Sequence, residues 1–409
     1  MMKHVRAARR VGCSLLVAAL VTVAWQAGAA QDTVKIALID VNDDAAPPFQ
    51  FVIDEINAAG GVLGSKQLEL VTFKPGFDVQ WSVEALQQAI AQGIPFVAMG
   101  SGSHIALALS EAAAEHNKAH PDRRVLYLNQ GAIDPALTND ECSFWHFRFD
   151  ADVDMKMAAI MSYLADHQDR IKKVFLIDQD YSFGHSFATA ARRQLHDKAP
   201  GIEIVGDEFH PLQKLKDFAP YVDKVKASGA DTVITGDWGN DLALLTRAGA
   251  DGGLDVNWYT FYADSGDVLR ALGDKGVGRV VKVSVWHENV DSKELLDRAA
   301  AFEEKYGVDW SDAQVRPMLE MLARAIDSAG APDPLKVALA LEDMRHETPL
   351  GEVHMRADNH QLIQPLYLSI LADDVPNRIE DTGLGFETLA KIPAEKTVTE
   401  TTCRMERPS

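Results

Sequence analysis

The sequence predicts an α/β protein whose parallel sheets are covered by helices on both faces. Strand-like and helix-like segments alternate along most of the chain with little interruption. The strand-like segments are short and almost wholly apolar, as expected for strands that are buried on both faces of a parallel sheet. Together these two features indicate helices packed in layers on parallel sheets.

The first series of elements begins with a strand at 34–40 and a helix that follows it. Apolar residues with the spacing of an amphipathic helix recur at Phe49, Val52, Ile53 and Ile56. The glycine pair at 60–61 ends this helix, since glycine readily adopts the left-handed conformation of a C-cap. The series continues with a strand at 66–73, a helix at 82–92, a strand at 94–99, a helix from about 104 and a strand at 124–129.

A second series follows residues 147–152 with the same alternation. Its helices are expected near 153–166, 185–198, 215–227, 240–249 and 265–272, and its strands at 172–178, 202–206, 231–236, 257–262 and 279–286. Helices near 292–306, 313–329 and 334–344 come next, and strands at 351–355 and 365–371 come last. The last twenty or so residues are the least regular, and we expect them to wrap the surface.

The first thirty residues have the features of a secretory signal peptide. A basic end is followed by an apolar stretch and then by small residues, with a plausible cleavage site at Ala27-Gly28-Ala29. The apolar stretch is too short for a membrane-spanning helix, and no other segment has the roughly eighteen apolar residues that one requires. A lipid anchor at Cys13 is disfavoured, because Arg10 occupies a position where a lipidation signal needs an aliphatic residue. We therefore predict an exported, soluble protein.

The mature chain is strongly acidic. The full sequence carries 40 basic and 60 acidic residues, a net charge of −20. Removal of residues 1–30 takes away four basic residues and no acid, which leaves 36 − 60 = −24. This charge argues against a nucleic-acid partner, which needs a basic face. The remaining residues, about 380, are too many for a single hydrophobic core and suit two domains.

Two cysteines remain after export, Cys142 and Cys403. Disulfides persist outside the cytoplasm, so we favour a bridge between them over two buried free thiols. The bridge would close a loop of roughly 260 residues and stabilise the fold by about 5 kcal/mol in the chain-entropy treatment. Because Cys403 lies near the end of the chain, the bridge would fasten the C-terminal tail.

A small, flexible loop at 100–104, Gly-Ser-Gly-Ser-His, joins a predicted strand to a predicted helix. In open parallel sheets, ligands bind beyond the carboxyl ends of the strands, and the N–H groups at the start of a helix attract anions. This loop is therefore a candidate for binding a carboxylate or a phosphate. The alternative is that Ser103 only caps the helix.

No catalytic or metal-binding pattern occurs in the sequence. The loop at 100–104 lacks the ending of a P-loop and the third glycine of a dinucleotide fingerprint, and there is no Gly-x-Ser-x-Gly elbow. The thirteen histidines lack the spacing of a zinc site. Lone acids such as Asp180 and Asp264 are more simply interpreted as solvated loop residues than as general bases. We expect no enzyme activity, no cofactor and no metal.

Aromatic residues follow several strands of the second series. They occur within the loops 180–184, 236–239, 262–264 and 286–287, whereas the first series has small and polar loops, as at 129–134. Binding sites commonly combine an apolar lining with a few placed polar groups. A pocket between the two series would hold a carboxylate on one side and an apolar body on the other.

Several motifs, taken in order, resemble those of a known family. They are the signal peptide, IDEINAAGGVLGSKQLELV at 53–71, GSGSH at 100–104, GAIDPALT at 131–138, FRFDAD at 147–152 and DYSFG at 180–184. Over residues 33–371 the chain resembles the periplasmic solute-binding proteins of ABC transporters, of the branched-chain amino-acid (leucine/isoleucine/valine-binding) type.

The resemblance implies a type I periplasmic binding protein fold, with two Rossmann-like lobes of parallel sheets joined by a three-segment hinge. The crossings are expected near 148–150, 287–290 and 348–351. The N-terminal lobe would comprise 31–148 and 289–349, the C-terminal lobe 150–287 and 351–385, and the tail 386–409.

The resemblance also implies which residues hold the ligand. Ser103 or His104 and the loop at Ala132 and Ile133 would hold a carboxylate, while rings would contact the rest of the ligand. The candidate ligand-binding residues are Ser101, Gly102, Ser103, His104, Gln130, Ala132, Ile133, Tyr181, Asp237, Trp238, Tyr262 and Asp264.

Three departures from the family pattern bear on the ligand. The loop at 40–48 is shorter and more acidic than the usual glycine-rich loop, and Ile133 stands where a threonine hydroxyl is common. Tyr262 stands where amino-acid binders place a glutamate for the ligand ammonium, and a desolvated ammonium without an anionic partner is costly. We therefore expect a carboxylate without an amino group, such as an aromatic acid, unless Asp264 or Asp237 substitutes.

The resemblance implies a binding function. A periplasmic monomer would capture a small carboxylate, either an amino acid or an aromatic or other organic acid, and deliver it to an ABC permease in the inner membrane. Ligand contacts with both lobes would favour the closed form. A sensor subunit for a membrane receptor needs the same closure and stays open as an alternative, and a hydrolase is the least supported function.

Overall fold

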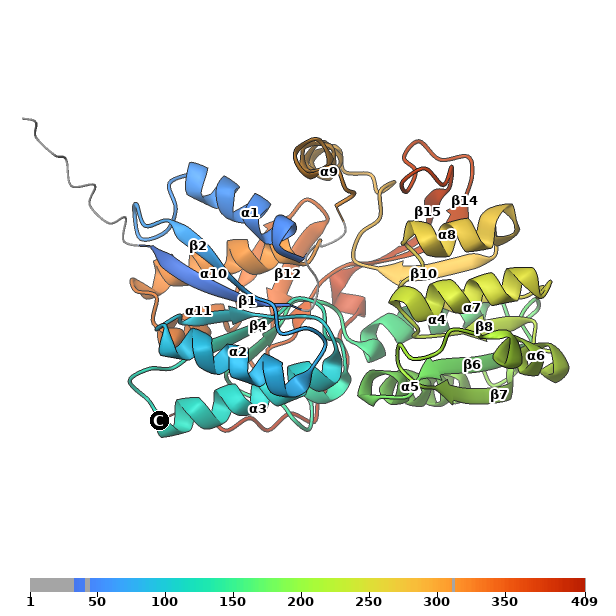
Figure 1. Cartoon of the computed structure of the whole chain (residues 1–409), viewed down its shortest axis with the longest axis horizontal. Coiled ribbons are helices and arrows are strands. Elements are labelled where there is room, and N and C mark those ends of the chain that lie inside the picture. The colour runs from blue at the N-terminus through green and yellow to red at the C-terminus, as the bar shows by residue number, and fades with distance from the viewer. Residues whose placement is uncertain (1–32, 41–44, 311–312, 409) are drawn as a thin grey trace, which may run out of the picture. The chain divides into compact units, whose positions relative to one another are not determined.

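Two sheets, each covered by helices on both faces, organise the chain (Figure 1). The computed structural model describes residues 33–40, 45–310 and 313–408. The predicted signal peptide and Cys13 lie outside these described residues. Residues Thr33–Ser409 group into one compact unit, and the following description concerns this unit.

The first sheet has five parallel strands in the order β2-β1-β3-β4-β5. Alternate residues of a strand point to opposite faces, so Ile36 and Leu38 pack in one core while Ala37 and Ile39 pack in another. The strands are β1 (Val34–Ile39), β2 (Leu68–Phe73), β3 (Phe96–Ala98), β4 (Leu126–Asn129) and β5 (His146–Arg148).

Helices cover both faces of the first sheet. One core takes its helical residues from α1 (Ala46–Ala58), α10 (Val315–Ala329) and α11 (Pro334–Leu341). The opposite core takes them from α2 (Val79–Ala91) and α3 (Ser103–Ala119). A further helix, α9 (Lys293–Tyr306), packs on α1 through an edge-to-face contact of the Phe51 and Phe302 rings, whose centroids are 5.5 Å apart.

The second sheet has seven strands in the order β15-β14-β10-β9-β8-β6-β7. Strands β6 to β10 are parallel, whereas β14 and β15 are antiparallel to their neighbours. The strands are β6 (Lys173–Gln179), β7 (Glu203–His210), β8 (Thr232–Ile234), β9 (Asn257–Thr260), β10 (Val280–Ser284), β14 (Leu366–Ala372) and β15 (Gly385–Ile392).

The helices of the second series also divide between two cores. Those that pack in one core are α4 (Val153–Asp166) and α5 (Ser182–Lys198). Those that pack in the other are α6 (Ala219–Ser228), α7 (Gly239–Asp251) and α8 (Gly266–Leu272). The predicted α/β class, with mostly parallel sheets covered on both faces, is therefore confirmed.

The chain passes between the two sets of cores more than once. Phe149 packs in a core of the first sheet and Ala151 in a core of the second, so one passage lies at 149–151. Another lies at 362–363, because Met355 and Leu362 pack in the core of the first sheet and Ile363 packs in a core of the second. The residues between α11 and β14 form a small antiparallel sheet. Its strands are β11 (Arg345–Thr348), β12 (Gly351–Met355) and β13 (Leu362–Ile363).

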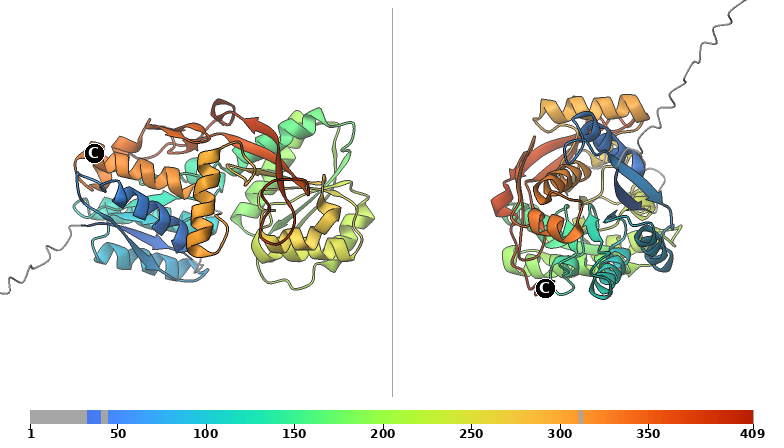
Figure 2. Two further views of the ribbon diagram at one scale, coloured as in Figure 1. Left: turned by 90° about the horizontal axis from the view of Figure 1, so that it is seen from above. Right: turned by 90° about the vertical axis from the view of Figure 1, so that its left-hand side faces the viewer.

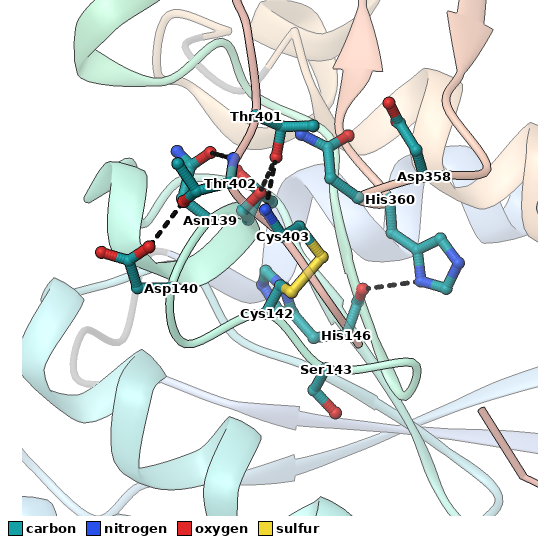
Figure 3. The surroundings of a disulfide bond; sticks show 12 residues. Asn139, Asp140, Cys142, Ser143, His146, Asp358, His360, Thr401, Thr402 and Cys403 are labelled. Carbon is teal, nitrogen blue, oxygen red and sulfur yellow. Dashed lines mark hydrogen bonds between the residues drawn. A yellow bond between two sulfur atoms is a disulfide. The ribbon is translucent and has the colours of Figure 1, made fainter. Parts of the chain in front are cut away.

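The C-terminal segment differs from the sequence prediction. The sequence prediction places 386–409 in a C-terminal tail, but residues 386–392 belong to β15, which pairs with β14 from Leu366↔Ile392 to Ala372↔Gly385. The chain then returns to the side of the first sheet (Figure 2) and ends near α3 (Figure 1). There Cys403 is bonded to Cys142, with an S–S distance of 2.06 Å (Figure 3). This is the pairing that the sequence predicts, and it fastens the tail.

Candidate functional site

A cavity of about 930 Å³ is lined by strand ends from both sheets. The residues that follow β1, β3 and β4 line it from the first sheet: Asp40, Gly100, Ser101, Gln130 and Gly131. The residues that follow β9 and the end of β10 line it from the second: Phe261, Tyr262, Asp264, Ser284, Val285 and Trp286. Carboxyl ends of parallel strands are where open α/β sheets bind ligands, so this cavity is the candidate site.

The rest of the wall comes from α9 and from two loops. Leu296, Ala299 and Glu303 of α9 line the cavity, as do residues between α9 and α10 and residues 376–379 between β14 and β15. These two loops contact each other, since the Glu380 N–H donates to Asp309 Oδ2 at 3.1 Å. The cavity is therefore bounded by elements far apart in sequence.

The cavity is lined by four of the predicted binding residues: Ser101, Gln130, Tyr262 and Asp264. The predicted residues that do not line it are Gly102, Ser103, His104, Ala132, Ile133, Tyr181, Asp237 and Trp238. Most of these eight have hydrogen-bond or packing partners within the protein.

The groups predicted to hold a carboxylate are occupied by the protein itself. The N–H groups of Gly131 and Ala132 donate to Asn129 Oδ1 at 3.0 and 2.8 Å. The Ser103 hydroxyl oxygen accepts from the Asp134 N–H at 3.3 Å, and Ile133 is buried in a core of the second sheet. An acid group would have to break the two bonds to Asn129 in order to use the N–H groups of Gly131 and Ala132, whereas the bond at Ser103 does not use the hydroxyl proton.

Four rings close the space in which Tyr181 and Trp238 were predicted to contact a ligand. Phe77 and His104 come from the first series, and their ring centroids lie 5.8 Å from Trp238 and 5.5 Å from Tyr181, respectively. Trp238 Nε1 donates to Tyr181 Oη at 2.8 Å. Burial lowers the pKa of His104, so this ring is neutral at pH 7. The protein's own side chains therefore fill this part of the predicted site.

Asp237 is buried inside the protein and paired with a histidine. Its side chain is wholly buried, and His210 Nε2 lies 2.7 Å from Asp237 Oδ2. It is thus unable to meet a ligand in the cavity, and of the two acids considered as substitutes for the missing glutamate only Asp264 remains.

Two buried lysines lie in the cavity wall, each paired with an acid. Lys282 Nζ is 2.9 Å from Asp264, and Lys156 Nζ is 2.8 Å from Asp150. Burial acts to raise the pKa of Asp264, but the charge and hydrogen bond of Lys282 outweigh it, and the pKa lies below its ordinary value. Asp264 is therefore ionised at neutral pH.

Comparison with known proteins identifies the family. The family described as periplasmic binding protein matches residues 41–374. The chain belongs to the periplasmic binding protein family.

Relatives of this periplasmic binding protein share its length and fold. A Leu/Ile/Val-binding protein homolog 4 of Brucella abortus is 27% identical, over 95% of this chain and 97% of the relative. A crystal structure of a leucine-, isoleucine-, valine-, threonine-, and alanine-binding protein from Brucella ovis, in a closed conformation, has a TM-score of 0.84, is 24% identical, and the match covers 92% of this chain and 100% of that one. A solute-binding protein of an ABC transporter from Rhodopseudomonas palustris, in complex with 3,4-dihydroxybenzoic acid, has a TM-score of 0.75 at 20% identity, with 89% and 98% covered.

In this periplasmic binding protein the first and third passages between the sheets are joined by buried hydrogen bonds. Arg148 is wholly buried, and its Nε donates to Gln361 Oε1 at 2.6 Å while its guanidinium also contacts Thr138 and Asp152. Gln364 Nε2 donates to the Phe149 carbonyl at 2.8 Å. These bonds position Asp150, and with it Lys156, in the cavity wall.

Sequence reasoning missed several residues of the cavity: Lys156, Lys282, Glu288, Glu303, Asp309 and Trp310. A signal existed for Lys282, which interrupts the apolar strand VVKVS, because a lysine inside a buried strand needs a partner. No local signal marks Trp310 or the α9 residues, since their place in the wall depends on how α9 packs.

The described residues contain neither a metal-binding cluster of side chains nor a helix suited to cross a membrane. Within residues 33–40, 45–310 and 313–408, no group of three or more His, Cys, Asp or Glu side chains is arranged to hold a metal ion. None of the helices in that same part of the chain is long and apolar enough to cross a membrane.

Proposed function

We propose that this periplasmic binding protein captures a small organic solute, an amino acid or an aromatic or other organic acid, and delivers it to an ABC permease in the inner membrane. The observation that carries this proposal is the cavity of about 930 Å³ at the strand ends of both sheets, a volume within the usual range for small-molecule sites. The proposal places the protein in the periplasm as a monomer, after removal of residues 1–30, and assigns it no turnover of the bound solute.

The cavity walls support a closure mechanism. We propose that the first sheet with its helices and the second sheet with its helices act as two lobes, and that the passages near 148–152, 284–290 and 362–366 act as the hinge. A solute that contacts Gln130 on one side and Tyr262 on the other favours the closed form by its extra affinity for that form. The permease then distinguishes the closed form from the open one.

A thermal-shift screen of the mature protein against amino acids and aromatic acids tests the proposal. A ligand at a thousandfold excess over its dissociation constant stabilises the folded state by about 4 kcal/mol, which raises the unfolding midpoint clearly. The bound solute should be recovered unchanged. Absence of any stabilising amino acid or organic acid, or chemical conversion of the solute, would contradict the proposal.

A further inference from the structure

Four rings form a closed circuit of contacts between the two lobes proposed above. Phe77 follows β2 and His104 is the second residue of α3, and the centroids of these two rings lie 5.1 Å apart. Tyr181 precedes α5 and Trp238 precedes α7, and Trp238 Nε1 donates to Tyr181 Oη at 2.8 Å. The two pairs face each other, with the Phe77 centroid 5.8 Å from that of Trp238 and the His104 centroid 5.5 Å from that of Tyr181. We call these four residues the ring clasp.

The two halves of the ring clasp are anchored in different cores. Phe77 packs against the core that contains α2 and α3, whereas Tyr181 and Trp238 pack against the core that contains α4 and α5. The Trp238 carbonyl also accepts from Gln179 Nε2 at 3.3 Å, which ties its backbone to the end of β6. A contact between the halves therefore joins two packed cores.

Gly102 allows the Phe77 ring to reach this position. The φ angle of Gly102 is +80°, in the left-handed region that glycine adopts readily. A Cβ at this position would lie 2.7 Å from Phe77 Cε2 and 2.9 Å from Phe77 Cζ. A side chain at position 102 would displace the ring, so this glycine, which the sequence marks as a candidate binding residue, admits Phe77.

The ring clasp lies beside the cavity and contributes nothing to its wall. Phe77, His104, Tyr181 and Trp238 are absent from the lining residues, and all four side chains are half-buried. The contacts across the clasp join protein groups directly and leave no place for a solute between the rings. They therefore do not depend on what occupies the cavity.

We propose that the ring clasp holds the two lobes together whether or not a solute is bound, and that it thereby raises the affinity for the solute. The apparent affinity of a protein is reduced by the fraction of molecules that are not in the form competent to bind. Lobes that are already held together spend less of the solute's binding energy on closure. The effect on affinity rests on the proposed function, whereas the effect on the separation of the lobes does not.

The size of the effect follows from the two contacts that cross between the lobes. Their ring planes are inclined by 61° for Phe77 and Trp238 and by 86° for His104 and Tyr181, which is the edge-to-face arrangement that ring pairs favour. Two such contacts favour the closed form over the open form by about five- to 150-fold. Removing them should lower the ratio of closed to open molecules by that factor.

Small-angle X-ray scattering of the mature protein without added solute tests the proposal directly. We expect the wild-type profile to fit the scattering calculated from this structure. The double variant Phe77→Ala, His104→Ala removes the half of the ring clasp that belongs to the first lobe, and its radius of gyration should be larger. Phe77→Leu keeps an apolar side chain against the core of α2 and α3, so it should fold even if the double variant does not, and it should show a smaller increase.

A matched control removes a ring contact that lies within one lobe. His167 stacks on Tyr163 at the end of α4, with 4.0 Å between the ring centroids. His167→Ala should therefore scatter as the wild type does. Circular dichroism of each variant confirms that it is folded before its scattering is interpreted.

Calorimetry with the solutes found by the thermal-shift screen measures the effect on affinity. The double variant should bind every such solute more weakly, by up to about 150-fold. The factor should be the same for chemically different solutes, because the loss lies in the population of the closed form and not in a contact with the solute.

The outcomes separate this proposal from the proposed function. A wild-type profile that fits separated lobes, or a folded variant with the wild-type radius of gyration, would overturn the clasp while the proposed function stands. An open variant that binds solutes as tightly as the wild type would overturn the link to affinity. If no amino acid or organic acid binds the wild type, the proposed function fails, and the scattering measurements still decide whether the clasp exists.

Discussion

Replacing both Cys142 and Cys403 by serine is expected to lower the free energy of unfolding by about 5 to 6 kcal/mol at 25 °C. The two cysteines are 261 residues apart in the sequence, and a bridge over so long a loop removes a large part of the entropy of the unfolded chain. In the chain-entropy treatment the entropy that the unfolded chain loses grows with the logarithm of the loop length. For a loop of this length the corresponding stabilisation is about 5 to 6 kcal/mol.

The folded structure should change little in this variant, because other contacts hold the tail. The Thr401 hydroxyl donates to the Thr138 carbonyl at 3.0 Å, and the Thr402 N–H donates to Asn139 Oδ1 at 3.1 Å (Figure 3). Arg407 also contacts Glu342 at 2.7 Å. The stability loss should therefore arise in the unfolded state, and solute affinity should be unchanged.

Urea unfolding followed by circular dichroism and by tryptophan fluorescence measures the effect. Coincident transitions of the two probes are needed before a single free energy is taken from the curves. The oxidised wild type, the wild type with its disulfide reduced, and the double serine variant are compared, and the last two should agree. A loss below about 1 kcal/mol would refute the entropic reasoning, and a loss of solute affinity would refute the claim that the tail stays in place.

Three further predictions concern single residues. Arg148→Lys should cost about 2 to 4 kcal/mol in urea unfolding, because lysine does not reproduce the fork that contacts Gln361 and Asp152; an unchanged midpoint would contradict this. Burial and then the charge of Asp237 raise the pKa of Asp178 well above its ordinary value, so the folded state keeps a proton that the unfolded state loses, and the contribution of this group to stability falls as pH rises above about 4. Asp178→Asn should remove this contribution, by up to about 1.4 kcal/mol per pH unit relative to the wild type, and wild-type and variant stability curves that run parallel from pH 4 to 8 would show the reasoning to be wrong. Gly184→Ala should lower the thermal midpoint, because a Cβ would lie 1.9 Å from the Gln179 carbonyl oxygen and force α5 away from β6. Alanine in an unobstructed helix would raise the midpoint, and a raised midpoint would contradict this prediction.

Most of the fold is predictable from local sequence pattern. The strand at 34–40 and the helix at 153–166 have nearly the predicted bounds, because a fully buried strand and an amphipathic helix leave strong apolar patterns. Strands β5, β11 and β13 were not predicted. They are two to four residues long, so their apolar pattern is too short to recognise.

The C-terminal strand β15 shows why pattern alone is insufficient. Most of its residues, such as Thr388 and Lys391, are exposed, and it lies at the edge of the sheet. Its conformation is fixed by hydrogen bonds to β14 rather than by burial of an apolar face. The passage at 362–363 also depends on tertiary packing rather than on local pattern. Val353 and Met355 of β12 pack in the core of the first sheet, so the chain crosses to the second sheet only after them.

The candidate site was predictable in place but not in detail. The rule that ligands lie beyond strand ends selects the loops of Ser101, Gln130 and Tyr262, which line the cavity. It also selects Tyr181 and Trp238, which do not line it; the contacts between these rings and Phe77 or His104 depend on how the two sheets meet and leave no local pattern. Lys282 interrupts an apolar strand, so the sequence marks it as needing a partner, but the pairing with Asp264 joins neighbouring strands, and no local pattern identifies that acid.

A crystal structure of the mature protein with its tightest-binding solute is the most direct test of the account. We predict that the solute occupies the cavity lined by Gln130, Tyr262 and Trp286 and contacts residues of both sheets. A solute bound between His104 and Tyr181, outside this cavity, would contradict it.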